Sequence, residues 1–126
     1  MSRARLLLSL VIGLALLAPL APGHAHHTFV TKFDGSKTIR LAGVVTSVSY
    51  SNPHIHFQVQ VGGTTWTVET ESISAARGHG LTQNVLKAGA KVTIAGWPAR
   101  DGSPALGLHS ISISGGPSMT MRRTAH

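Results

Sequence analysis

The chain has 126 residues, of which 42% are hydrophobic, and its eleven Lys and Arg against four Asp and Glu give a formal net charge of +7. This length suits one domain, and the absence of cysteine excludes a disulfide, a lipid attached at cysteine and a cysteine nucleophile. The positive charge favours anionic partners, but the basic residues are scattered along the chain, so we interpret the charge mainly as a contribution to solubility.

Residues 1–25 have the pattern of a cleavable secretory signal peptide. Two arginines near the start precede a predominantly apolar run over 6–20, and small residues, Gly23 and Ala25, occupy the −3 and −1 positions of a cleavage site. The run is shorter than the roughly 20 residues that a membrane-spanning helix needs. We therefore expect export to the periplasm or the medium and no membrane span after cleavage. An uncleaved anchor, or cleavage after Gly23, are the alternatives.

The 126 residues less these 25 leave 101, which begin with an N-terminal arm over 26–38. The remainder alternates with the period of two that is typical of strands, most cleanly over 54–61. Gly62-Gly63 then predicts a two-residue hairpin turn. The expected strands cover residues 39–50, 54–61, 64–70, 91–97 and 106–114.

One short helix is expected between the third and fourth strands. Ser72 is a suitable N-cap, and the helix should run to about Gly78 before Gly80 ends it. Five strands with a helix in this gap predict a mainly β fold, a small OB-like β-barrel over residues 39–114. A small antiparallel sandwich or an open sheet is the alternative. Residues 115–126, rich in Gly, Pro, Ser and Thr, are expected to form a disordered tail.

Histidine is unusually frequent, with eight in the chain. Cleavage after Ala25 would leave His26 and His27 at the new amino terminus. There the α-amine and an imidazole offer a bidentate chelate for Cu(II). Cleavage two residues earlier would leave His24-Ala25-His26, an arrangement that also suits Cu(II) or Ni(II). The simpler interpretation is that export leaves polar residues at a flexible end.

A second histidine pair lies on the expected second strand. His54 and His56 are two residues apart, so both imidazoles project from the same face. A turn at Gly62-Gly63 places His56 opposite Glu69 and His54 opposite Glu71, on the face turned away from the apolar side chains, with Cβ atoms about 4.5–5.5 Å apart. This patch predicts a site for Zn(II) or Cu(II). Surface His–Glu pairing without a metal is the alternative.

Several short motifs occur in a characteristic order over residues 25–114. They are Ala25-His26-His27, Phe33-Asp34, Leu41-x-Gly43-x-Val45, Ser51-Asn52-Pro53-His54, Trp66-x-Val68-Glu69, Leu86-Lys87-x-Gly89-x-Lys91-Val92 and Asp101-Gly102-Ser103. The set resembles a family of small exported bacterial proteins of unknown function. The resemblance implies a periplasmic location and a small β-barrel, and no established activity. Glu71 stands where relatives are expected to carry a small residue.

These observations predict a periplasmic binding protein rather than an enzyme, since the chain contains no glycine-rich phosphate loop and no G-x-S-x-G turn. The expected ligand is a transition metal, copper first and zinc second. The alternative is an OB-type module that binds a sugar polymer, a peptide or a protein partner without a metal. Nucleic-acid binding is disfavoured because exposed, interleaved aromatic residues are lacking. The oligomeric state stays open. The expected metal ligands are His26, His27, His54, His56 and Glu69.

Overall fold

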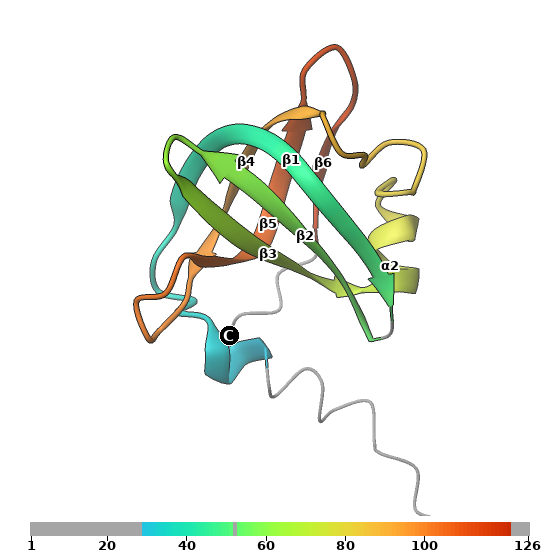
Figure 1. The fold of residues 1–126 in the computed structure, drawn as a ribbon. Helices are drawn as coiled ribbons and strands as arrows, with labels where there is room; N and C mark the ends of the chain where they lie inside the picture. Colours follow the sequence, from blue (N-terminus) through green and yellow to red (C-terminus); the bar gives the residue numbers. More distant parts are fainter. Residues whose placement is uncertain (1–28, 52, 122–126) are drawn as a thin grey trace, which may run out of the picture.

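The computed structural model describes residues 29–51 and 53–121 (Figure 1). The expected signal peptide, His26, His27 and residues 122–126 lie outside the described residues. A helical turn over 29–32 comes first. The elements that follow are β1 (Ile39–Ser51), β2 (His54–Val61), β3 (Thr64–Ser72), α2 (Ile73–Gly78), β4 (Lys91–Pro98), β5 (Ala105–Ile113) and β6 (Ser118–Thr120).

The strands form one sheet that closes into a barrel. The strand order is β3-β2-β1-β4-β5-β6, and neighbours in this order are antiparallel. The barrel is closed by a short parallel pairing between β3 and β5, in which Thr67 to Glu69 lie beside Ala105 to Gly107. Five strands closed in this way, with a helix between the third and fourth, confirm the predicted OB-like barrel.

The first strand serves both halves of the barrel. Its first six residues pair with β4 and its second half pairs with β2, so it curves across the top of Figure 1. Gly43 lies where β1 passes closest to β2, because a Cβ there would overlap the carbonyl oxygen of Gln60. The register irregularity itself lies further along, between Val45 and Ser47. Glycine therefore permits a close approach of two strands, and the bulge follows it.

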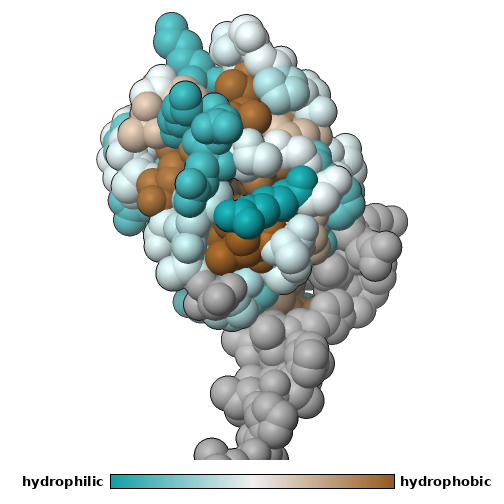
Figure 2. Space-filling model, turned by 90° about the vertical axis from the view of Figure 1, so that its right-hand side faces the viewer, coloured by the Kyte–Doolittle hydropathy of each residue, from teal (hydrophilic) through white to brown (hydrophobic). Residues whose placement is uncertain are grey.

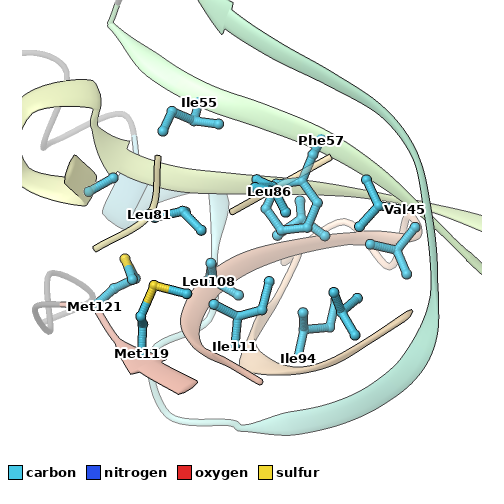
Figure 3. Close-up of a cluster of buried hydrophobic side chains, with 14 of the residues drawn as sticks. Val45, Ile55, Phe57, Leu81, Leu86, Ile94, Leu108, Ile111, Met119 and Met121 are labelled. Carbon is cyan, nitrogen blue, oxygen red and sulfur yellow. The ribbon is translucent and has the colours of Figure 1, made fainter. Parts of the chain in front are cut away.

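The main core fills the barrel and extends beneath α2. Ser72 Oγ accepts a hydrogen bond from the backbone N–H of Ala75, as expected for an N-cap, and Gly80 adopts a positive φ of 96° just after the helix. The segment after the helix is fastened by Tyr50, whose hydroxyl donates to the carbonyl oxygens of Thr82 (3.0 Å) and Leu86 (3.3 Å). Core side chains labelled in Figure 3 include Val45, Ile55, Phe57, Leu81, Leu86, Ile94, Leu108 and Ile111.

The predicted disordered tail is wrong for the residues that the structure describes. After a turn at Gly115 and Pro117, β6 pairs with β5 and buries Met119, while Met121 beyond it is also buried (Figure 3). The glycine and proline that suggested a disordered segment instead form the turn of a hairpin. Two methionines at a spacing of two then supply a short apolar face that the barrel accepts.

A second apolar cluster fastens the N-terminal arm to the outside of the barrel. Phe29 and Phe33 pack with Trp97, Ala99 and Ala105, and their rings cover Gly107 of β5. Phe29 and Phe33 are four residues apart on one helical turn, which places both rings on one side. The arm is therefore part of the folded unit.

Away from the arm the surface is mostly polar. Figure 2 views the side that carries α2 and shows hydrophilic side chains lying across small hydrophobic patches. Among the described residues, no helix is long and apolar enough to cross a membrane.

The first prediction concerns Tyr50. Tyr50→Phe removes the hydrogen bonds to the 82–86 segment and should lower the free energy of unfolding by about 1 kcal/mol in urea titrations. Burial raises the pKa of Tyr50 above its ordinary 10.0. The stabilisation that the protonated hydroxyl contributes is therefore complete below pH 10 and is lost as the pH rises through the pKa of Tyr50 in the folded state. The stability difference between wild type and variant should therefore shrink in alkali. A constant difference would contradict this account.

The second prediction tests how the arm is seated. A Cβ at residue 107 would lie 2.6 Å from Phe29 Cζ and 3.0 Å from the Phe33 ring. Gly107→Ala should therefore lift the arm, speed proteolysis before residue 34, and cost about 1–3 kcal/mol by overpacking. Gly63→Ala is the matched control, because its Cβ would meet nothing within 4 Å. Equal proteolysis of the two variants would show that the arm does not depend on the missing side chain.

Candidate functional site

The hairpin of β2 and β3 brings a histidine and a carboxylate together as the sequence predicted. Val61 pairs with Thr64 across the Gly62-Gly63 turn, and the same register continues to His56, which pairs with Glu69. His56 and Glu69 are therefore cross-strand neighbours on one face of the hairpin.

The pairing of His54 with Glu71 was wrong. Between the pairs His56–Glu69 and His54–Ser72, a single residue of β2, Ile55, lies opposite two residues of β3. This bulge moves β3 by one residue, so Glu71 leaves the register of His54. The carboxylate of Glu71 instead lies 2.8 Å from Nδ1 of His79, just after α2.

Glu69 is the centre of the resulting cluster. Nε2 of His56 lies 3.6 Å from its Oε2, and Nε2 of His54 lies 3.9 Å from its Oε1. A third basic group, the ammonium of Lys32 on the arm, is closest at 3.0 Å from Oε2. The carboxylate of Glu69 on β3 is therefore surrounded by two imidazoles from β2 and by one lysine from the arm.

The cluster is less open to water than the alternating pattern predicted. The side chain of Glu69 is 9% exposed and that of His54 is 11% exposed, whereas His56 reaches 39%. The arm supplies part of the cover, since the ring of Phe29 lies 6.5 Å from that of His54. Nδ1 of His54 is buried and has no hydrogen-bond partner among the described residues. A buried carboxylate is costly unless paired, which is why the surrounding basic groups matter.

The donor spacing can be compared with that of a metal centre. Two ligands that each lie about 2.1 Å from a tetrahedral metal ion are roughly 3.4 Å apart. The two His–Glu distances, 3.6 Å to Oε2 and 3.9 Å to Oε1, are longer than that separation and involve different oxygens. The two imidazole rings are 6.3 Å apart at 87° to one another. Across residues 29–51 and 53–121, no group of three His, Cys, Asp or Glu side chains is arranged to hold a metal ion as it stands. Metal binding would need these three side chains to rearrange around the ion.

Sequence reasoning missed Lys32 as a member of the site. The signal was present in the Phe29-x-x-x-Phe33 spacing, which predicts a helical turn whose remaining face carries Lys32. The spacing does not show where that turn docks. It docks over Gly107, which has no side chain to block it, and the β3–β5 pairing places Gly107 beside Glu69.

A shallow groove of about 200 Å³ adjoins the cluster on the outer face of β1, β2 and β3. Its lining residues are Ser47, Val48, Ser49, His56, Phe57, Gln58 and Thr67. A larger hollow of about 540 Å³ lies elsewhere, over β1, β4 and β5, and Lys91 is the one titratable residue among its described lining residues. We base the site on the smaller groove because the buried carboxylate and the histidines are beside it.

Solved structures of similar fold include the S. pombe Stn1–Ten1 complex, with a TM-score of 0.51, 15% identity, and coverage of 60% of this chain and 57% of that chain. A ZRD-deleted mutant of TiaS in complex with agmatine has a TM-score of 0.49, 17% identity, and coverage of 64% and 22%. The chain thus spans 57% or less of the solved chains named here. At 15% identity the likeness to the Stn1–Ten1 complex shows the fold alone.

Sequence comparison identifies a family without assigning a function. No curated protein matches the chain. Residues 15–109 match the family described as "Family of unknown function (DUF6152)". This range contains the arm, the hairpin of β2 and β3, and all three described residues around Glu69. Because the match covers three quarters of the chain, this protein belongs to that family of unknown function.

Proposed function

We propose that the chain is an exported, non-enzymatic binding protein of the periplasm that binds a transition metal ion, Cu(II) first and Zn(II) second. The observation that carries the proposal is the convergence of His54 and His56 on the buried carboxylate of Glu69. Export is supported by the signal-peptide pattern of residues 1–25.

The choice of metal follows from the chemistry of the donors. Two imidazole nitrogens with a single carboxylate suit Zn(II) and Cu(II), whereas Ca(II) and Mg(II) need several oxygen ligands. Among divalent ions of the first row, affinity for such a set is highest for copper. Coordination by His54 would use Nε2, the nitrogen that faces Glu69.

The remaining ligands in this proposal are His26, His27 and the terminal amine. Both histidines lie outside the described residues. Phe29, the first described residue, has its ring 6.5 Å from that of His54. Ligands from the arm would complete the set that the barrel begins.

The third prediction is metal binding itself. The full chain is expressed and purified after the cell has processed it. Calorimetric titration should then show one bound Cu(II) ion with a dissociation constant below about ten micromolar, and weaker binding of Zn(II). His54→Ala combined with His56→Ala should weaken the affinity roughly tenfold or more, because removal of supporting groups alone costs 10–100-fold. Glu69→Gln should act in the same direction.

Two controls separate the site from histidine content in general. His79→Ala removes a histidine that pairs with Glu71, outside the Glu69 cluster, and should leave the affinity unchanged. One residue added before the processed amino terminus should weaken Cu(II) binding if the terminal amine is a ligand. Affinity no tighter than tens of micromolar in the unmodified protein would rule out the proposal.

A second candidate function is supported by the groove beside His56. Its walls combine hydroxyl and amide groups with the partly buried side chain of Val48, a mixture that suits a sugar polymer, a peptide or a protein partner. The fourth prediction separates the candidates. Pull-downs from periplasmic extract are made with and without chelator. If metal binding is the function, no partner should still be captured when chelator is present and His56→Ala is the bait. A partner retained under chelator and lost on Gln58→Ala would favour the second function.

A further inference from the structure

Lys32 is the nearest cation to Glu69 among the described residues. Its ammonium lies 3.0 Å from Oε2, closer than either imidazole nitrogen. A lysine ammonium is a compact charged group on a flexible stem, with three N–H donors. The buried carboxylate therefore has a cationic partner in addition to the two imidazoles.

Lys32 is also placed there by the fold. It belongs to the helical turn over 29–32, which Phe29 and Phe33 fix to the barrel above Gly107. Its own side chain remains 46% exposed, so the ammonium can move although the backbone is held.

Building on the proposed function, we propose that Lys32 is the resident cation of the site, and that a divalent metal ion binds Glu69 only by exchanging with the Lys32 ammonium. Lys32 and an ion held by His56 would compete for the same oxygen atom, Oε2, which is the oxygen nearest to both side chains. A coordinated ion would lie about 2.1 Å from that oxygen, and an ammonium 3.0 Å from it would face a doubly charged neighbour with little solvent between them.

The surroundings of Lys32 allow the exchange. Its ammonium lies 5.3 Å from the centre of the Phe33 ring, a contact that it can keep after leaving Glu69. Asp101, in the loop after β4, is a second carboxylate near enough to be affected. The pKa of Asp101 is lowered chiefly by hydrogen bonds from Ser103 and, to a smaller degree, by the charge of Lys32. The displaced ammonium therefore has an acidic neighbour in the solvent.

The exchange would lower the affinity for every ion by the same factor, because the cost of displacing Lys32 does not depend on the ion. Zn(II) and Cu(II) gain enough from two imidazoles to overcome this cost. Mg(II) and Ca(II) bind imidazole weakly and would gain mainly from the one carboxylate. Lys32 thus acts as a competing cation that makes no contact with the bound metal.

Lys32→Met tests this directly, because it keeps the length of the side chain and removes the charge. The affinity for Cu(II) and Zn(II), measured by calorimetry or by competition with a chelator, should rise about tenfold, comparable to the effect of one nearby charge on a titrating group. Lys32→Arg keeps the charge and should bind as the unmodified protein does. Lys37→Met removes the same charge from an exposed arm residue that pairs with Asp34, and should leave the affinity unchanged.

The outcomes separate the inference from the proposed function. Equal affinity in Lys32→Met and the unmodified protein overturns the exchange and leaves metal binding intact. If Lys32→Met binds the metal and the unmodified protein does not, the exchange is supported and metal binding by the native chain is overturned. Absence of binding in every variant overturns both. If thermal denaturation shows that Lys32→Met does not fold, Lys32→Gln replaces it with the same expected result.

Discussion

The short parallel pairing of β3 with β5 is the constraint on which the rest of the molecule depends. It closes the barrel, so that the core has no open side between these strands. It also places Glu69 directly beside Gly107, where the phenylalanine rings of the arm approach the backbone. Barrel closure, the seat for Phe29 and the environment of the carboxylate are therefore consequences of the same three-residue ladder.

Local signals were sufficient to predict most of the barrel. Strict alternation in β2 and the Gly62-Gly63 turn determine the register of the hairpin, and hence the His56–Glu69 pair. Ser72 predicts the start of α2 because few residues satisfy the free N–H groups of a helix so well. These features depend on residues close together in the chain, where the physical rules are strongest.

The features that were missed depend on contacts between distant segments. The bulge opposite Ile55, which separates His54 from Glu71, involves a buried Thr70 whose hydroxyl lies 3.3 Å from the Ile55 carbonyl. β6 forms because the barrel buries the side chain of Met119. The polar residues that flank Met119 gave no indication of this strand. Lys32 reaches Glu69 across 37 positions of sequence. No periodicity within a single segment carries such information.

The bare backbone at Gly107 has an evolutionary consequence. A relative with any side chain at this position could not accommodate two phenylalanine rings there, and so would have to hold its amino-terminal segment differently. Within the family, glycine at this position should consequently co-occur with the aromatic pair and with lysine before the second aromatic residue. An alignment can thus divide the family into members in which a lysine pairs with the carboxylate and members in which only the imidazoles do.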